Sequence, residues 1–337
     1  MNLEGKSILI TGGTGSLGKA ITNYLIENHP KIKRVVIFSR DEQKQFQMSY
    51  DYPIDKHPFM RYFIGDVRDI NRLKRAFQGV DYVIHAAAMK HVHIAEYNPT
   101  ECISTNIDGA NNVIQAALES KVSRIVALST DKACAPVNLY GATKLTSDKL
   151  FVAANNIRGE NPIKFSVVRY GNVMGSNGSV IPFFKKMKEQ RNELPITHPE
   201  MTRFNIPIEG GVDMIFHALE HAMGGEIFIP KIPSYRILDV AEAIGPDCSK
   251  PIVGVRPGEK IHEEMITAAD SLNTYDLGKY YVILPNEVSW NLQHYLESNN
   301  GFKVQEGFRY NSGENTEWET VKSLRSKIKN YLDFDFV

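Results

Sequence analysis

A glycine-rich segment near the amino terminus restricts the fold of this chain more than any other feature. An apolar stretch at residues 7–11 leads directly into three glycines spaced three residues apart. Between a strand and a helix, such glycines permit a tight turn and a close approach of the backbone to a pyrophosphate. A turn without a ligand is the alternative, but the position after the first strand favours dinucleotide binding. The predicted contacts are Gly12, Thr14, Gly15, Ser16, Leu17 and Gly18.

Strand-like and helix-like segments alternate through the first half of the chain. Short apolar runs, most of them rich in β-branched residues, recur at 7–11, 34–39, 61–65, 82–85, 124–128 and 164–169, with amphipathic stretches between them. This alternation predicts an α/β fold with a doubly wound parallel sheet of the Rossmann type.

After residue 169 the alternation loosens, and a helix near 209–223 and a strand at 226–230 are the clearest elements. We therefore predict a dinucleotide-binding domain at residues 1–170, which 205–232 rejoins. Residues 171–204 and 233–337 are expected to form a smaller, discontinuous substrate-binding lobe.

Composition excludes several classes of partner. The 39 basic residues equal the 39 acidic residues, so no net field attracts nucleic acid or an anionic membrane. The sequence contains no apolar run approaching the roughly 20 residues that span a bilayer, and no signal peptide is recognisable. Three cysteines without CxxC spacing favour the reducing cytoplasm over a disulfide framework or a zinc site.

The end of the second strand bears on the choice of cofactor. An NAD site usually places a carboxylate here for the ribose 2′-hydroxyl, whereas this chain has Ser39 and Arg40, followed by Lys44. A guanidinium suits a 2′-phosphate, so we predict NADP. Asp41 would favour NAD if its carboxylate held the ribose, and Arg40 could instead be a solvated surface cation. Further contacts are expected after the third and fourth strands, from Asp66, Val67, Ala86 and Ala87.

A candidate catalytic group follows the fifth strand, where Thr130, Asp131 and Lys132 are consecutive. Tyr140 and Lys144 come next and share a helix face because they are four residues apart. A lysine beside a phenol lowers its pKa, so Tyr140 is predicted to be a general base for hydride transfer to nicotinamide. An Asp–Lys pair supplies an acid and a base for elimination, although an ordinary surface ion pair is the alternative.

These residues resemble the extended short-chain dehydrogenase/reductases. Within that group the chain is similar to the inverting UDP-N-acetylglucosamine 4,6-dehydratases that begin pseudaminic acid synthesis. The similarity spans residues 5–265 and rests on FSRDE at 38–42, GDVRD at 65–69, HAAAMKHV at 85–92, STDKA at 129–133, NLYGATK at 138–144, RYGNV at 169–173, GSVIPF at 178–183, MTRF at 201–204 and RPGEK at 256–260.

The resemblance implies a three-step reaction. Carbon 4 of the sugar is oxidised, water is lost across carbons 5 and 6, and hydride returns to carbon 6 while carbon 5 is reprotonated on the opposite face. Thr130 is then expected to bind the carbon 4 oxygen. Asp131, if protonated, would protonate the leaving hydroxyl. Lys132, if burial and Lys144 depress its pKa, would take or return the carbon 5 proton.

The UDP-sugar needs local cations, because the chain has no net positive charge. The candidates for binding its sugar and diphosphate, together with the nucleotide-lining ranges 177–181 and 195–197, are Lys90, Asn172, Ser179, Val180, Thr197, Arg203, Arg256 and Glu259. Each could instead be an exposed polar residue. His91 and His93 are spaced like metal ligands, but no third ligand is evident, so no metal is expected.

Two other functions fit the same fold. A UDP-hexosamine 4-epimerase would need Tyr140 and Lys144 but not the acid–base pair, and a cofactor-sensing regulator would need none of these residues. The expected partners are a UDP-sugar and further copies of the chain, in a dimer or a larger homo-oligomer such as a hexamer. Helices near 100–120 and 138–156 could pair across a two-fold axis.

Overall fold

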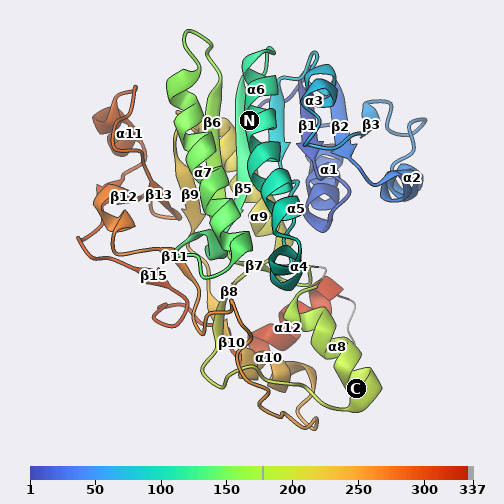
Figure 1. Cartoon of the computed structure of the whole chain (residues 1–337), viewed down its shortest axis with the longest axis vertical. Helices are drawn as coiled ribbons and strands as arrows, with labels where there is room; N and C mark the ends of the chain where they lie inside the picture. Colours follow the sequence, from blue (N-terminus) through green and yellow to red (C-terminus); the bar gives the residue numbers. More distant parts are fainter. Residues whose placement is uncertain (177, 333–337) are drawn as a thin grey trace.

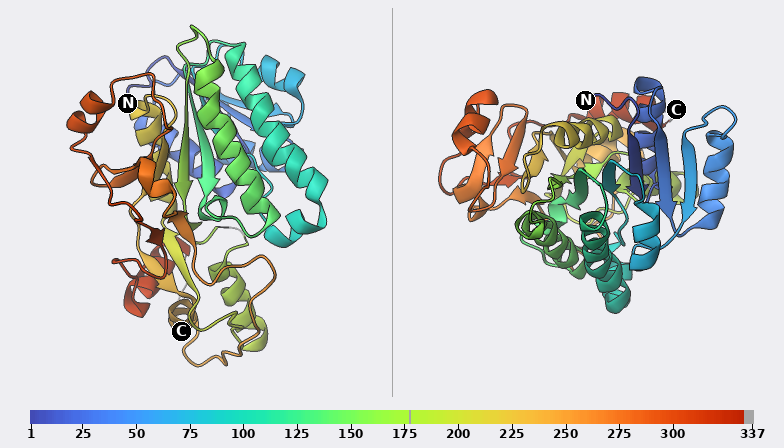
Figure 2. Two further views of the ribbon diagram at one scale, coloured as in Figure 1. Left: turned by 60° about the vertical axis from the view of Figure 1, so that its left-hand side comes forward. Right: turned by 90° about the horizontal axis from the view of Figure 1, so that it is seen from above.

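The computed structural model describes residues 1–176 and 178–332. Its main sheet has ten strands in the order β14-β12-β13-β9-β6-β5-β4-β1-β2-β3. The strands from β9 to β3 are parallel, and helices cover both faces (Figures 1 and 2), which confirms the predicted doubly wound fold. The parallel strands are β1 (Ser7–Thr11), β2 (Arg34–Ser39), β3 (Met60–Ile64), β4 (Tyr82–His85), β5 (Arg124–Thr130), β6 (Lys164–Tyr170) and β9 (Ile227–Pro230).

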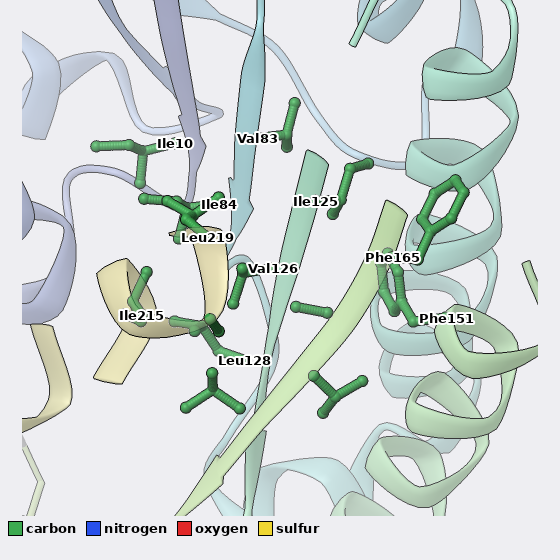
Figure 3. Close-up of a cluster of buried hydrophobic side chains, with 14 of the residues drawn as sticks. Ile10, Val83, Ile84, Ile125, Val126, Leu128, Phe151, Phe165, Ile215 and Leu219 are labelled. Carbon is green, nitrogen blue, oxygen red and sulfur yellow. The ribbon is translucent and has the colours of Figure 1, made fainter. Parts of the chain in front are cut away.

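Buried apolar side chains alternate between the two faces of this sheet. Figure 3 shows Val126 beside Ile215 and Leu219 of α9, whereas Phe165 lies beside Phe151 of α7. All five side chains are fully buried. Each such burial contributes roughly 1.5–3 kcal/mol, which explains why the strands read as continuous apolar runs.

The helices of the nucleotide-binding half connect successive strands. Helices α1 and α9 pack together, as do α6 and α7. These helices are α1 (Ser16–Asn28), α2 (Glu42–Asp51), α3 (Ile70–Ala76), α4 (Val92–Tyr97), α5 (Pro99–Ile103), α6 (Gly109–Leu118), α7 (Leu139–Ile157) and α9 (Ile208–His221). A π-helical turn at Ser104–Asp108 joins α5 to α6, and a 3₁₀ turn at Asp131–Ala133 follows β5. No helix among the described residues is long and apolar enough to cross a membrane.

A smaller lobe with its own apolar core lies below the main sheet in Figure 1. It contains a three-stranded sheet of β10, β8 and β7, and a two-stranded sheet of β11 and β15 lies between it and the main sheet. These strands are β7 (Asn172–Val173), β8 (Thr202–Ile206), β10 (Ser234–Arg236), β11 (Glu264–Ile266) and β15 (Tyr310–Asn311). The helices of the lobe are α8 (Val180–Arg191), α10 (Ile237–Ile244) and α12 (Val321–Leu332).

The C-terminal part of the chain differs from the predicted division. Residues 233–337 were assigned to the lobe, yet β12 (Thr274–Asp276), β13 (Tyr280–Ile283) and β14 (Phe302–Lys303) extend the main sheet, with α11 (Leu292–Ser298) between β13 and β14. Strand β13 pairs antiparallel with β9, so it satisfies the backbone groups of what would otherwise be a sheet edge. Strands this short leave little pattern in a sequence. Another 3₁₀ turn, Asp270–Asn273, precedes β12.

Candidate active site

The glycine turn between β1 and α1 has the geometry that its sequence predicts. Gly12 has a φ of 66°, and a Cβ there would lie 2.9 Å from the backbone of Ala87. A Cβ at Gly18 would lie 2.3 Å from the oxygen of Gly13. A Cβ at Gly15 would meet only the oxygen of Gly12, at 3.3 Å. The first and third glycines are therefore required by close backbone packing, whereas the middle one leaves space at the helix N-terminus, where Ser16 and Leu17 begin α1.

The residues after β2 separate into two groups. The Ser39 hydroxyl lies 3.0 Å from that of Thr14, and the Arg40 side chain is 59% exposed. Asp41 instead caps α2, because its carboxylate accepts a hydrogen bond from the Lys44 N–H at 2.9 Å. The Lys44 ammonium is 3.1 Å from the same carboxylate. Arg40 and Ser39 thus remain at the cofactor end of the strand, while Asp41 stabilises a helix.

The predicted contacts after β3 and β4 differ in exposure. The Asp66 carboxylate lies 3.8 Å from the Arg40 guanidinium and 2.7 Å from that of Arg68, which the sequence analysis did not single out. Val67 is buried and packs against Gly109. The backbone of Ala86 and Ala87 packs against Gly12, and both alanines are partly exposed. Asp66 is therefore better placed than Val67 to reach a ligand.

The predicted catalytic residues come together at the carboxyl end of β5. This strand extends to Thr130, two residues further than predicted, and Asp131 and Lys132 form the following turn. Thr130 donates a hydrogen bond to the Asp131 carboxylate at 2.9 Å, and the Lys132 ammonium donates to the same oxygen at 3.0 Å. The Asp131 side chain is fully buried, so the pair is not a solvated surface ion pair.

Tyr140 lies in the first turn of α7 and is buried beside this group. Burial raises its pKa to about 12, while Lys132 and a hydrogen bond with Thr130 act in the opposite direction. The net shift of the phenol pKa is therefore upward, opposite in direction to the lowering predicted from Lys144. Lys144 lies one turn further along α7, and burial lowers its pKa against the opposing effect of Asp148. Both predicted residues share one buried helix face.

A buried amide that the sequence analysis missed holds this helix in place. Asn106, in the π-helical turn, donates to the Thr143 hydroxyl at 3.0 Å and to the Met89 carbonyl at 3.0 Å. Its side-chain oxygen accepts from the Met89 N–H at 2.8 Å. Asn106 thereby ties the loop after β4 to the helix turn that carries Lys144. A π turn is a common local device at functional sites, but it has no sequence signature.

Two carboxylates lie beside the Lys132 ammonium and affect its pKa. Burial acts to lower its pKa, but the neighbouring carboxylates of Asp131 and Glu263 outweigh this effect and raise it above the ordinary lysine value. Glu263 Oε1 lies 3.3 Å from the ammonium. The condition set for Lys132, a pKa depressed by burial and Lys144, is therefore not met in this structure, because two carboxylates face the amine and raise its pKa. Burial, followed by Glu263, raises the pKa of Asp131.

Arg203 also belongs to this buried cluster. Its guanidinium lies 3.9 Å from Glu263 and donates to the carbonyls of Thr202 at 2.7 Å and Ile261 at 3.1 Å. Arg203 is predicted to bind the diphosphate, whereas these contacts direct it toward the protein interior. Asn172 is similar, since its side-chain oxygen lies 3.5 Å from the Lys132 ammonium.

The other predicted substrate contacts make no hydrogen bond or ion pair with this cluster among the described residues and lie on α8 and in the loop before β8. Ser179 occupies the N-cap position of α8, its buried hydroxyl has no hydrogen-bond partner among the described residues, and Val180 begins the helix. The Thr197 hydroxyl contacts the sulfur of Met201 at 3.4 Å. Position 177, within the predicted nucleotide-lining range 177–181, lies outside the described residues.

The loop that carries Arg256 and Glu259 lies beside the start of α7. The Arg256 guanidinium is 65% exposed and 3.8 Å from the Glu259 carboxylate. Asn138, the N-cap of α7, donates a hydrogen bond to the Gly258 carbonyl at 2.8 Å. Lys90 is exposed in the loop after β4.

Cys134 and His91 also lie in segments that border the site. Cys134 is buried, and burial raises its thiol pKa to about 12, so it is a packing residue. His91 packs close to Gly178, and within residues 1–176 and 178–332 no three His, Cys, Asp or Glu side chains gather as a metal site.

The parallel sheet, the glycine turn and the Tyr140–Lys144 helix face define the class of extended short-chain dehydrogenase/reductases. The chain belongs to the family described as "Polysaccharide biosynthesis protein", whose model matches residues 8–285. It is 56% identical to the UDP-N-acetylglucosamine 4,6-dehydratase (inverting) of Campylobacter jejuni strain 81-176, over 98% of this chain and 99% of that one.

Two further proteins are similar along nearly their whole length. The UDP-glucose 4-epimerase of Rickettsia canadensis is 39% identical over 97% of both chains. The X-ray structure of Pen from Bacillus thuringiensis superimposes with a TM-score of 0.89 at 36% identity and covers 98% of this chain and 99% of that one. The whole chain, including the lobe, is therefore shared with these relatives.

Proposed function

We propose that this chain is an NADP-dependent lyase that removes water from UDP-N-acetylglucosamine with inversion at carbon 5. The product would be UDP-2-acetamido-2,6-dideoxy-β-L-arabino-hex-4-ulose. The observation that carries this proposal is the buried Asp131–Lys132 pair at the end of β5, next to the Tyr140–Lys144 helix face. The high identity to an inverting dehydratase over nearly the full chain supports it.

The residues around the glycine turn fit NADP. The turn leaves space at Gly15 for a pyrophosphate, and the N-terminus of α1 offers N–H groups to it. Arg40 and Ser39 lie at the end of β2, where the adenosine ribose binds in this fold, and Asp41 is engaged as a helix cap. The largely exposed Arg40 guanidinium, which lies 3.8 Å from the Asp66 carboxylate, could still reach a 2′-phosphate and favours it.

The glycine turn and Lys144 would hold the cofactor, which would supply reversible hydride transfer for carbons 4 and 6 of the sugar. Tyr140 would take the proton of the carbon 4 hydroxyl, so that a ketone forms as the hydride leaves. Thr130 would hold the carbon 4 oxygen. The ketone acidifies the carbon 5 proton, whose loss expels the carbon 6 hydroxyl with a proton from Asp131 as water. Lys132 would take or return the carbon 5 proton, and Lys144 would hold the ribose.

The nucleotide-sugar would extend from the catalytic residues at the end of β5 toward the smaller lobe. The residues proposed to contact it are Lys90, Asn172, Ser179, Val180, Thr197, Arg203, Arg256 and Glu259. The N-terminus of α8 at Ser179 and the exposed Arg256 are the described features best suited to a diphosphate. Arg203 would act mainly through the buried cluster, because its described hydrogen bonds go to protein carbonyls.

The product would enter pseudaminic acid synthesis for surface or flagellar glycosylation. We propose a cytoplasmic location, which is supported by three buried cysteines that form no disulfide. We also propose a homo-oligomer of two or more chains, as expected from the resemblance.

Incubation of the purified chain with NADP and UDP-N-acetylglucosamine tests the proposed reaction. Mass spectrometry should show a nucleotide sugar lighter by one water, and NMR should show a new methyl group and the inverted configuration at carbon 5. An isomer of unchanged mass would identify a 4-epimerase, the activity named for the Rickettsia relative. An unchanged substrate in the presence of bound cofactor would favour a regulator.

A further inference from the structure

Asp148 lies on α7 one helical turn after Lys144, and the proposed mechanism gives it no part. Asp148 is 1% exposed and Lys144 is 4% exposed, so both charged groups are buried. We propose that Asp148 is a positioning residue whose negative charge holds the buried Lys144 side chain as the ammonium ion that binds the cofactor ribose. This inference deepens the proposed function and rests on its assignment of Lys144 to the ribose.

The Asp148 carboxylate is fixed by two strands of the main sheet. Its Oδ2 atom accepts a hydrogen bond from the Ser129 hydroxyl at 2.7 Å and another from the Arg169 guanidinium at 3.1 Å. Ser129 and Arg169 are paired residues of β5 and β6. Arg169 also donates to the Met265 carbonyl of β11 at 3.0 Å. The carboxylate therefore belongs to a buried network that holds it against the sheet.

The helix brings this carboxylate close to Lys144. Side chains four residues apart lie on the same side of a helix, with their Cβ atoms about 5–6 Å from one another. Tyr140, Lys144 and Asp148 are thus successive positions along one buried face of α7. Asp148 forms its ion pair with Arg169, and it is the acid among the described residues whose charge acts on Lys144. A buried amine without such a charge loses its proton readily, because low-dielectric surroundings disfavour the ammonium form.

The other ionisable groups around Lys144 do not replace this acid. They are Tyr140 on its own helix, His85 from β4 and, behind Asp148, Arg169 from β6. Burial, followed by Lys144, lowers the pKa of His85 to about 3, and burial raises the pKa of Tyr140 to about 12. Both groups therefore stay neutral over the neutral and mildly alkaline range. Burial lowers the pKa of Lys144 and Asp148 opposes this effect, so Lys144 is the member of the set that changes charge there.

Asp148 thus serves two buried cations in different ways. It binds Arg169 directly, and it acts on Lys144 through space across one helical turn. An ammonium ion makes stronger, charge-assisted hydrogen bonds to ribose oxygens than a neutral amine does. The carboxylate would not touch the cofactor itself, so its effect on binding would pass entirely through Lys144.

Asp148→Asn tests the proposal, because it removes the charge and nearly preserves the shape. NADPH affinity would be measured by fluorescence titration over a pH series from neutral to alkaline. In the wild-type protein the affinity should fall on the alkaline side as Lys144 loses its proton. In the variant this fall should begin at lower pH, by about one unit or more, because the ammonium has lost its countercharge. An unmoved fall in the variant would overturn the proposal.

Two further variants at this place show whether charge or packing is responsible. Ser129→Ala removes the hydrogen bond to the same oxygen but leaves every charge, so it should keep the wild-type pH dependence. Asp148→Glu keeps the charge and should also show an alkaline fall close to that of the wild type. If Ser129→Ala moved the fall as far as Asp148→Asn does, packing would explain the effect and the proposal would be refuted.

Lys144→Met identifies the group that causes the alkaline fall. This variant should bind NADPH more weakly and should lack the fall. A fall that persists without Lys144 would mean that cofactor affinity does not respond to the charge on this lysine, which also contradicts the proposal.

Asp148→Asn leaves the Arg169 guanidinium buried without a countercharge, which can prevent folding. The double variant Asp148→Asn/Arg169→Met removes both charges and still deprives Lys144 of its acid. It should show the same shift to lower pH, and a folded double variant that titrates like the wild type would refute the proposal. These measurements follow cofactor binding and not turnover. A chain with the expected pH dependence that does not dehydrate UDP-N-acetylglucosamine would contradict the proposed reaction but not the role of Asp148.

Discussion

The proposed cofactor end and the proposed proton-transfer cluster of this molecule are built in different ways. Every residue assigned to the glycine turn and the ribose end lies within a few positions of the carboxyl ends of β1 to β4. The cluster around Lys132 combines residues from the turn after β5, from β8 and from the segment before β11. One region can be recognised from short contiguous motifs, whereas the other exists only after the lobe has packed against the sheet.

Lys132→Ala should give the largest effect and should separate the two regions functionally. Without the amine, dehydration is expected to fall by about 10²–10⁴-fold, the usual contribution of a general acid or base. Carbon 4 oxidation should persist in part, because the glycine turn, Tyr140 and Lys144 are untouched. Stopped-flow absorbance of NADPH, combined with mass spectrometry of the sugar, would measure both steps.

Lys132→Arg is the control for this variant, since it keeps a cation beside Asp131 and Glu263 but gives up its proton far less readily. It should fold normally and remain deficient in dehydration. Unchanged turnover in Lys132→Ala would remove the lysine from the mechanism and leave the cluster with a purely structural role.

Alanine substitutions at two glycines of the same turn should have different effects on stability and on NADP binding. Gly12→Ala is expected to lower the free energy of unfolding by about 2–4 kcal/mol, because the new Cβ meets the Ala87 backbone at a φ of 66°. Gly15→Ala should lower the free energy of unfolding by no more than about 1 kcal/mol, since it changes only a helix N-cap. Its main effect should be weaker NADP binding, by tenfold or about 1.4 kcal/mol.

Denaturant unfolding and NADP titration of the two variants would check this contrast. Equal stabilities for Gly12→Ala and the wild type would contradict the packing seen in the structure. Unaltered NADP affinity in Gly15→Ala would mean that the space beside this glycine does not receive the pyrophosphate.

The same contrast explains how far the sequence could predict the molecule. The parallel sheet followed from apolar runs that are buried on both faces, and the Asp131–Lys132 pair followed from its position at a strand end. Glu263 could not be found, because nothing in its local sequence shows that β11 packs against the turn after β5. The direction of the pKa shift of Lys132 could not be predicted for the same reason, since it depends in part on this distant carboxylate.

Substitutions at Arg40 and Asp41 should have the smallest effects, and they test which cofactor the end of β2 selects. Arg40→Ala should weaken NADP binding by about 10–100-fold, or roughly 1.5–3 kcal/mol, because a charge-assisted contact to the 2′-phosphate is lost. NAD affinity should hardly change. Asp41→Ala should leave the preference for NADP intact and lower the free energy of unfolding by about 1 kcal/mol, because α2 loses its N-cap.

Cofactor titrations and denaturant unfolding of the Arg40→Ala and Asp41→Ala variants would show which of these two residues binds the adenosine ribose end of the cofactor. If Asp41→Ala weakened NAD binding while Arg40→Ala changed neither affinity, the carboxylate would be the ribose ligand and the chain would prefer NAD. If each variant behaves as expected, the two adjacent residues have different roles. The guanidinium then selects the phosphate, and the carboxylate is unable to compete because the Lys44 N–H and the start of α2 already occupy it.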